Sequence, residues 1–500
     1  MSVRDRLGSL FKDREELDLT SGSIAKPLLY LSVPIVITNL LQTAYNLADT
    51  FWLGQYSTEA LAAITFAFPM VFLLIALALG LSVAGSVLVA QYTGAEEPRR
   101  AEYAASQTVG FTVVVSLLLG ALGYVAVDDF LRILGAAPEV VPLATGYMQV
   151  YSLGLLFVFG FAVFVSLMRG YGDTVTPMLV MFGSVVLNIA LDPIFIFGFD
   201  DNPLFGYLGA RGLEATLLAR TGFAGAGIEG AAIATVFSRA LAFAVGIGIM
   251  FRGERGVRIR LGQLLPERRY ARRLLDIGLP ASVEGTGRAL SVNLMLFIIA
   301  AFPTTTVAAF GIGTRVFSVI FLPAIAFSQG VETMTGQNIG ARNLDRAERT
   351  NHYGAKVMLV TLTALGLAIF LAAAPIAAVF TDNPAVVAVA TDFLRITAPT
   401  FGFIGVMRSY SGGFRGAGKT LIAAAVAIVM LGVIRLPMAW VAADALGEFG
   451  LWVSFAVSNV AGGVVAYLWF LRGTWRDADL TEGFDGAPTV DVEAEAAGDD

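Results

Sequence analysis

Long apolar segments, separated by short polar ones, fill the chain from about residue 27 to residue 472. Most of them exceed the roughly 20 residues that an α-helix needs to cross about 30 Å of hydrocarbon. No polar segment is long enough to build a separate soluble domain, so the pattern predicts an all-α integral membrane protein. Hydropathy and turn signals together predict twelve transmembrane helices, with approximate bounds 27–53, 59–90, 102–127, 141–167, 175–199, 224–251, 273–300, 305–335, 349–380, 386–411, 420–443 and 449–472.

The distribution of arginine sets the expected orientation in the membrane. The connection after the sixth predicted helix is rich in arginine, from Arg252 to Arg273, and the connections after helices two, four, eight and ten are also basic. Basic connections face the cytoplasm, so we expect a multi-pass protein of the plasma membrane with both termini inside the cell. Residues 1–26 are charged and mixed in character, which argues against a cleaved signal peptide.

Composition narrows the chemistry that the chain can perform. Hydrophobic residues make up 56% of the chain, and there is no cysteine and only one histidine. This excludes disulfides, thiolate metal sites and paired-histidine zinc motifs, so we expect no transition metal and no cofactor. The stretch after Arg476 has acidic but no basic residues, which predicts a disordered cytoplasmic tail over 474–500.

The chain contains an internal repeat with an offset of 246 residues. The offset continues without a gap from Pro34, matched with Pro280, to Arg169, matched with Arg415. Each half has six predicted helices, so both halves enter the membrane in the same direction and form two six-helix bundles related by a pseudo-two-fold axis along the membrane normal. The predicted segments are a cytoplasmic N-terminal segment at 1–25, an N-terminal lobe at 26–252, an inter-lobe linker at 253–271, a C-terminal lobe at 272–473, and the tail.

The two halves differ in their polar residues. In the first predicted helix Asn39, Gln42, Asn46 and Asp49 fall on one helical face. Asn188 and Asp192 share a face of the fifth helix in the same way, because they are four residues apart. The repeat partners in the second half carry no carboxylate, and with a two-residue adjustment at the proline after Asp192 they are Gly285, Arg288, Val292, Met295, Ile434 and Leu436.

The aspartates in the N-terminal half point to an ion site. An ionised aspartate in a membrane helix costs roughly 3 kcal/mol, so it normally faces water, a partner or a bound ion. Asp49, Asp192 and Thr235 are expected at similar depths in the outer half of the bilayer, and their oxygen atoms suit either a proton or a sodium ion. Pro193 removes a backbone donor and predicts a kink or a free carbonyl group. A hydrogen-bonded aspartate pair used only for packing is the structural alternative.

Four segments, in this order on twelve helices with a six-plus-six repeat, resemble the multidrug and toxic compound extrusion (MATE) family. They are "SVPIVITNLLQTAYNLADTFWLG", "LNIALDPIFIFG", "GIEGAAIATVFSR" and "TGQNIGARNLDRAER". The resemblance covers about residues 24–472 and is greatest with the bacterial and archaeal branch that has carboxylates in the N-terminal lobe. It implies alternating-access export of amphipathic organic compounds in exchange for protons or sodium ions. It also implies a cation site formed by Asp49, Asn188, Asp192 and Thr235, and bending of the first helix on protonation or ion release in this lobe.

Further residues are expected around the substrate cavity or behind the cation site. These residues are Gln42, Tyr45, Asn46, Pro193, Glu284 and Arg288. A structural pair between Glu284 and Arg288 is at least as well supported as a coupling role for Glu284. The expected partners are small drug-like molecules and membrane lipid, with the protein a monomer.

Three other functions have weaker support. The segment "GFRGAGKT", Gly413–Thr420, matches the phosphate-binding loop pattern, but it lies between two predicted helices with no strand before it, so it predicts a tight turn, and we expect no nucleotide or nucleic-acid partner. An enzyme is not expected, because no nucleophile and base are grouped. A flippase for lipid-linked oligosaccharides or another lipid is the main alternative. It would be favoured if four arginines converged on the central cavity, namely Arg288, Arg315, Arg395 and Arg435.

Overall fold

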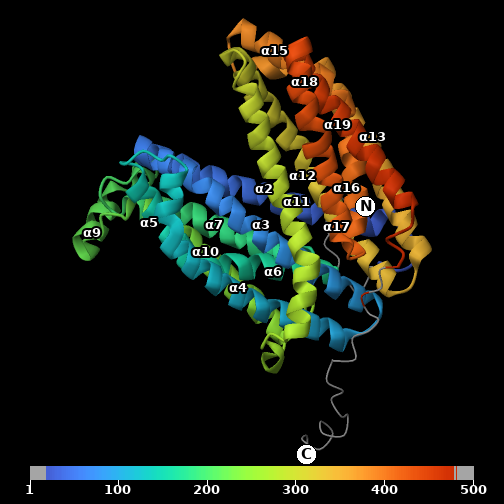
Figure 1. The fold of residues 1–500 in the computed structure, drawn as a ribbon. Coiled ribbons are helices and arrows are strands. Elements are labelled where there is room, and N and C mark those ends of the chain that lie inside the picture. Colours follow the sequence, from blue (N-terminus) through green and yellow to red (C-terminus); the bar gives the residue numbers. More distant parts are fainter. Residues whose placement is uncertain (1–17, 478–479, 481–500) are drawn as a thin grey trace, which may run out of the picture.

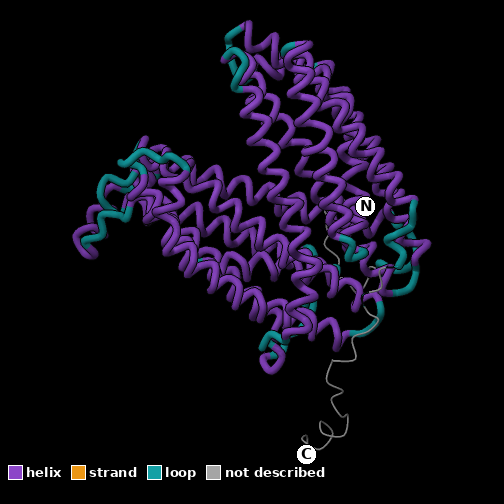
Figure 2. The backbone as a smooth tube through the Cα atoms, in the orientation of Figure 1, coloured by secondary structure: helices purple, strands orange, loops and turns teal. Residues whose placement is uncertain are grey.

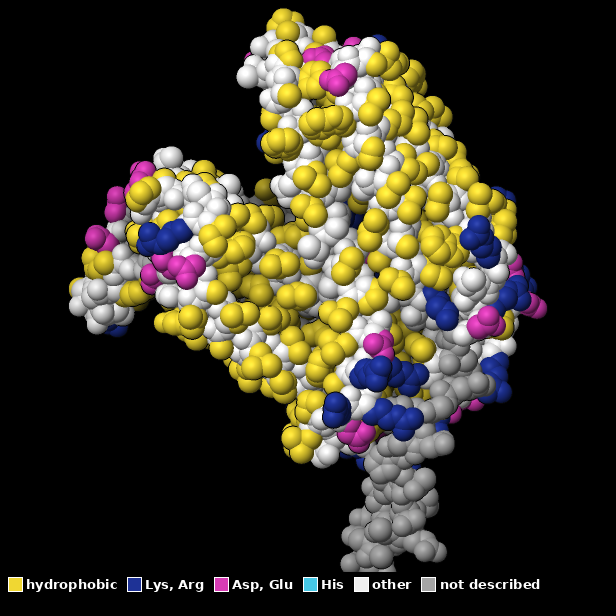
Figure 3. All heavy atoms as spheres, viewed as in Figure 1, with side chains coloured by type: hydrophobic (Ala, Val, Ile, Leu, Met, Phe, Trp, Pro, Cys, Tyr) yellow, Lys and Arg dark blue, Asp and Glu magenta, His cyan; other side chains and the backbone are white. Residues whose placement is uncertain are grey.

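The computed structural model describes residues 18–477 and Leu480, and this part of the chain contains helices but no strand (Figure 2). The predicted N-terminal segment and acidic tail fall largely outside the described residues. The helices form two lobes that meet at one end and diverge at the other (Figure 1). A space-filling view shows the wide cleft that this divergence leaves between the lobes (Figure 3).

The N-terminal lobe contains six transmembrane units. The fourth is divided by a 55° bend at Gly154, where an added Cβ would lie 2.2 Å from the Val236 side chain. The sequence predicted one continuous helix there, and the close approach of a neighbouring helix explains the break. The units are α2 (Ala25–Tyr56), α3 (Thr58–Gly94), α4 (Pro98–Ile133), α5 (Val141–Leu153) with α6 (Leu155–Tyr171), α7 (Val175–Phe197) and α10 (Gly227–Arg252). Two short helices, α8 (Pro203–Tyr207) and α9 (Arg211–Thr221), lie between α7 and α10.

The C-terminal lobe repeats this plan after a connection that contains the 3-10 turn η2 (Leu261–Gln263). Its units are α11 (Arg268–Ile299), α12 (Thr304–Gly340), α13 (Leu344–Leu371) with α14 (Ala373–Ala378), α15 (Pro384–Thr397) with η3 (Ala398–Thr400) and α16 (Phe401–Gly416), α17 (Thr420–Ile428) with η4 (Val429–Arg435) and α18 (Leu436–Leu446), and α19 (Glu448–Leu471). Ten helical segments are long and apolar enough to cross a membrane, and the bent α5–α6 pair makes an eleventh. The 32-residue α11 completes the twelve predicted helices.

The lobes touch most closely at the closed end of the cleft, through two glycines that are repeat partners. An added Cβ on Gly94 would lie 1.8 Å from the Gln337 carbonyl oxygen, and one on Gly340 would lie 1.8 Å from the Gln91 carbonyl oxygen. Only glycine allows backbones to approach this closely. The pseudo-two-fold axis predicted from the repeat therefore passes through this contact.

The glutamine side chains at the closed end repeat the symmetry. Gln91 donates from Nε2 to the Gly416 carbonyl oxygen at 3.0 Å, and Gln337 donates to the Gly170 carbonyl oxygen at 3.0 Å. Each pair of partners differs by 246 residues. Because all four groups are buried and matched, these bonds hold the lobes together where the cleft closes.

The first helix of each lobe begins against the opposite lobe. Leu28 and Leu31 of α2 belong to the apolar core of the C-terminal lobe, whereas Leu274 and Ile277 of α11 belong to that of the N-terminal lobe. The predicted lobe boundaries divide the sequence, but the packing exchanges these first turns. A change in either helix is therefore expected to alter the packing of both lobes.

One turn of the C-terminal lobe alters the register of the repeat. In the N-terminal lobe Gly230 packs against the backbone of Phe195 in α7, and in the C-terminal lobe Gly450 packs in the same way against Ala442 in α18. Phe195 and Ala442 therefore occupy equivalent positions, at an offset of 247 residues. The additional residue is accommodated in the π-helical turn η4, as expected when a helix widens by one residue. The match made from the sequence was instead shifted by two residues at the proline after Asp192, so this register corrects that alignment. It pairs Asn188 with Arg435.

Candidate cation site

The structure brings the four residues predicted for the cation site together inside the N-terminal lobe. Asp49 lies on α2, Asn188 and Asp192 lie on α7, Thr235 lies on α10, and each is at most 7% exposed. The Asn188 amide donates from Nδ2 to Oδ1 of Asp192 at 2.9 Å. The carboxyl group of Asp49 lies close to the side chains of the other three. Three helices therefore contribute to one buried polar cluster.

Within the part of the chain that the structure describes, several oxygen atoms in this cluster have no hydrogen-bond partner. They are Oδ1 of Asp49, Oδ2 of Asp192, Oδ1 of Asn188, Oγ1 of Thr235 and the hydroxyl of Tyr45. A buried polar atom without a partner is costly, and most are satisfied in folded proteins. Carboxylate, amide and hydroxyl oxygens are also the ligands that hard cations prefer. The arrangement can therefore hold a proton or a small hard cation.

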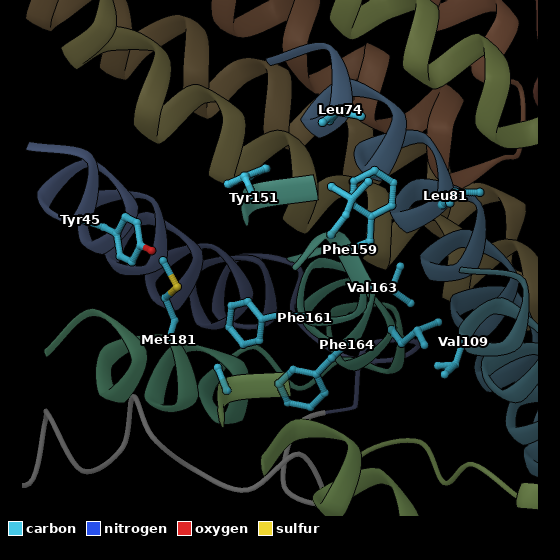
Figure 4. Packing of buried hydrophobic residues seen from close by; sticks show 14 of the residues in the cluster. Tyr45, Leu74, Leu81, Val109, Tyr151, Phe159, Phe161, Val163, Phe164 and Met181 are labelled. Carbon is cyan, nitrogen blue, oxygen red and sulfur yellow. The ribbon is translucent and has the colours of Figure 1, made fainter. Parts of the chain in front are cut away.

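Arg239 is a member of the site that the sequence analysis missed. Its side chain is buried on α10, donates from Nη2 to Oε1 of Gln42 at 2.7 Å, and lies 4.6 Å from the ring centre of Tyr45 and 5.2 Å from that of Phe161. Figure 4 shows these two rings beside Met181, whose sulfur lies 3.1 Å from Nη1 of Arg239. An arginine four residues after Thr235, on the same helical face, was the available signal.

The other predicted polar residues of α2 are connected to this arginine. Gln42 accepts from Arg239 and donates from Nε2 to Oδ1 of Asn46 at 3.1 Å. Asn46 is exposed, whereas Tyr45 is buried between Arg239 and the carboxylates. Hydrogen bonds therefore join the exposed Asn46 to Gln42 and Arg239, and Tyr45 lies between Arg239 and the cluster around Asp49.

Pro193 lies within α7, which continues to Phe197 rather than ending at the proline. Its carbonyl oxygen accepts a hydrogen bond of 2.8 Å from Nδ2 of Asn202, the buried first residue before α8. The backbone amide of Asn202 in turn donates to Glu214 at 2.5 Å, and Glu214 pairs with Arg211 at 2.8 Å. The long connection between α7 and α10 is thus a structured brace on the end of the helix that carries Asp192.

Glu284 and Arg288 do not belong to this site. They lie on α11 and form the predicted pair at 3.2 Å, within a larger buried group of charges near the closed end. Glu284 also pairs with Arg415 at 3.0 Å, and Arg415 pairs with Glu332 at 2.9 Å. Arg169 of the N-terminal lobe lies 4.0 Å from Glu332. This group therefore includes residues from both lobes.

The segment that matches a phosphate-binding loop is a turn between two helices, as predicted. It runs from the end of α16 to the first residue of α17. Gly418 has a φ of 70°, and the hydroxyl of Thr420 donates to the Ile277 carbonyl oxygen at 2.7 Å. The threonine that would contact a nucleotide-bound metal is therefore used for packing between helices.

Comparison with known proteins identifies the family. The MatE family model matches residues 34–194 and 280–441, one segment in each lobe. "Probable multidrug resistance protein YpnP" of Bacillus subtilis is 26% identical, with 93% of this chain and 98% of that protein covered. The "FAD transporter" of Shewanella oneidensis is also 26% identical, over 91% and 96%. A crystal structure of MATE in the straight conformation matches with a TM-score of 0.82 and 26% identity, over 93% of this chain and all of that one. The chain belongs to the MATE family of membrane transporters.

Proposed function

We propose that this transporter exports amphipathic organic compounds in exchange for one monovalent cation bound between Asp49 and Asp192. The observation that carries the proposal is the set of buried, unpartnered oxygen atoms on α2, α7 and α10. Multidrug resistance relatives support the export of drug-like compounds. A bound proton or sodium ion satisfies the oxygens, and its release leaves them unmatched, so the ion changes the stability of this arrangement.

The charges of the site support the binding of one monovalent cation. Two ionised carboxylates, Asp49 and Asp192, together with the guanidinium of Arg239, leave one negative charge in a buried environment. One monovalent cation neutralises that charge, whereas a divalent cation reverses it. Because unbalanced charge inside a membrane protein is strongly disfavoured, binding of a single proton or sodium ion is favoured.

The cleft supports an amphipathic substrate. The visible walls between the lobes are mostly apolar and uncharged, and many Lys and Arg side chains lie toward the closed end, with others at the tip of the N-terminal lobe and elsewhere on the surface (Figure 3). We propose that the closed end, where the described chain begins and ends, faces the cytoplasm and that the cleft opens outward.

The flippase alternative required four arginines to converge on the cavity, and they have separate surroundings. Arg288 pairs with Glu284, and Arg435 contacts Ser458 inside the C-terminal lobe. Arg395 lines a separate pocket with Asp392, and Arg315 is exposed on α12. This dispersal favours drug export over recognition of a lipid-linked pyrophosphate.

Drug flux in proteoliposomes, driven separately by proton and sodium gradients, tests the proposal. We expect one of the two gradients to drive export by the parent protein, and both Asp49→Asn and Asp192→Asn to abolish gradient-driven flux. Asp392→Asn removes a carboxylate of the C-terminal lobe and should retain the flux. Gradient-driven flux in both N-terminal variants would overturn the proposal.

A further inference from the structure

The C-terminal lobe contains a buried arginine, Arg435, at the end of the π-helical turn η4. Its side chain is 8% exposed and lies across α19, where Nε donates to the Ser458 hydroxyl at 2.8 Å and Nη2 donates to Oδ1 of Asn459 at 2.8 Å. The guanidinium lies 4.4 Å from the ring centre of Phe455. The described contacts therefore include one aromatic face and two neutral oxygen atoms.

The neutral partners of Arg435 are fully used. The Ser458 hydroxyl donates to the Phe455 carbonyl oxygen at 3.0 Å, and the Asn459 amide donates to the Thr400 hydroxyl at 3.0 Å. Arginine has five N–H donors, and two of those on Arg435 are matched in the described part of the chain. The Ser458 hydroxyl and the Asn459 amide thus present their oxygen atoms to Arg435. Within the described part of the chain, the other N–H groups of Arg435 remain free to donate to a further acceptor.

No described carboxylate balances the charge of Arg435. The ion pairs of the lobe involve Glu284, Glu332 and Glu348, and none of these reaches Arg435. Cation–π contact with Phe455 and two hydrogen bonds to neutral groups recover only part of the cost of burying a guanidinium. A buried arginine with free donors and no acidic partner is a site with affinity for an anion.

The position of Arg435 corresponds to the cation site of the other lobe. The 247-residue register matches Arg435 with Asn188 and Asp192 with Ala439, and the start of α19 matches Thr235 with Phe455 at an offset of 220. The two lobes therefore present buried sites at equivalent positions with opposite charge. Widened helical turns such as η4 also occur frequently at functional sites.

We propose that Arg435, Ser458 and Asn459 form a binding site for a small singly charged anion, either a chloride ion or the carboxylate of a small organic molecule. Phe455 covers one face of the guanidinium and α19 covers one edge, so N–H groups on the remaining edge are left to bind the anion. This site is separate from the proposed drug and cation sites. A bound anion would balance the charge of the buried Arg435 guanidinium.

Thermal unfolding of the full chain in lipid nanodiscs tests the proposal without any transport measurement. Chloride and acetate are each substituted for gluconate at constant ionic strength and pH. We expect at least one of them to raise the unfolding midpoint of the parent by about 2 °C at ten times its dissociation constant. Arg435→Met should lose this increase, and Arg395→Met, which removes an arginine from an exposed position, should retain it.

The anion that raises the unfolding midpoint shows whether the ligand is a halide or a carboxylate. An increase with chloride identifies a free halide, and an increase with acetate alone identifies a carboxylate ligand. Crystals of the parent grown with bromide give a second readout that does not depend on a variant, with an anomalous peak expected beside Arg435 for a halide site. The proposal is overturned if neither anion shifts the parent midpoint relative to gluconate, or if Arg435→Met keeps the shift.

Discussion

The two lobes share one helical plan, yet among the described residues only the N-terminal lobe contains paired carboxylates at its centre. Asp49 corresponds to Met295 and Thr235 corresponds to Phe455, and both C-terminal residues lie in the apolar core of their lobe. The repeat therefore preserves the positions of the helices, and under the proposed function a few side chains decide which lobe binds a cation. The same difference would let a nearly symmetric frame respond to an ion in one half only.

The packing of the two interiors reinforces this difference. Aromatic rings fill the C-terminal lobe, with ring centres 4.8 Å apart for Phe317 and Phe401 and 4.2 Å apart for Phe393 and Trp452. Such close aromatic packing stabilises one arrangement. The corresponding region of the N-terminal lobe contains unpartnered oxygens around Asp49. We therefore expect ion-dependent movement to begin in the N-terminal lobe.

The largest expected effect on stability comes from the charges at the closed end. Arg415→Met leaves Glu284 and Glu332 buried without their main partner, and breaking such a pair typically costs about 3–5 kcal/mol. Reversible unfolding in mixed micelles measures the change. Arg315→Met, which removes an exposed arginine from α12, is the control and should differ little from the parent. Equal stability of the two variants would show that the buried charges at the closed end do not stabilise the fold.

Substitutions that exchange a carboxylate and an apolar side chain at equivalent positions test the difference between the lobes. Met295→Asp places a carboxylate in an apolar core, at a cost of roughly 3 kcal/mol. Asp49→Met removes a buried carboxylate and should leave stability unchanged or increase it, while abolishing coupled transport. Unfolding of both variants under one condition tests this opposite response. Destabilisation of similar size in both would contradict the assignment of the ion site to one lobe.

The glycine contact at the closed end predicts an intermediate effect. Gly340→Ala introduces a Cβ 1.8 Å from the Gln91 carbonyl oxygen, so the backbones must separate, at a typical cost of about 1–3 kcal/mol. Gly311→Ala on the same helix meets nothing within 4 Å and is the matched control. Cross-linking of cysteines introduced across the closed end should decrease for Gly340→Ala alone. Unchanged cross-linking would mean that another contact closes this end.

The smallest effect is expected from the brace on α7. Asn202→Ala removes buried hydrogen bonds to the Pro193 and Gly198 carbonyl oxygens, which should cost about 1–2 kcal/mol. Amide exchange near the outer end of α7 should become faster, whereas exchange in α18 of the other lobe should not change. Asn293→Ala, at an exposed position, provides the control. Slow exchange retained in the Asn202 variant would show that the connection does not support the site.

The sequence was sufficient for features that depend on membrane burial and on local periodicity. Hydropathy located the helices, the 246-residue offset predicted paired lobes, and helical spacing placed Asn188 beside Asp192. Features that arise from contacts between distant segments were not predicted. These include the break at Gly154, where α10 packs so closely that a side chain would meet Val236, and the crossing of Arg239 to Gln42. Hydropathy indicates whether a residue can face lipid, but not which residue of another segment it contacts.

The most direct test of the cation site is the number of ions displaced when a drug binds at equilibrium. Calorimetry in buffers of different ionisation enthalpy counts protons, and displacement of radioactive sodium counts sodium ions. We expect the parent to release about one cation per bound drug, Asp192→Asn to release none, and Arg435→Met to match the parent. Release of one cation by Asp192→Asn, or loss of release in Arg435→Met alone, would contradict a single cation site in the N-terminal lobe.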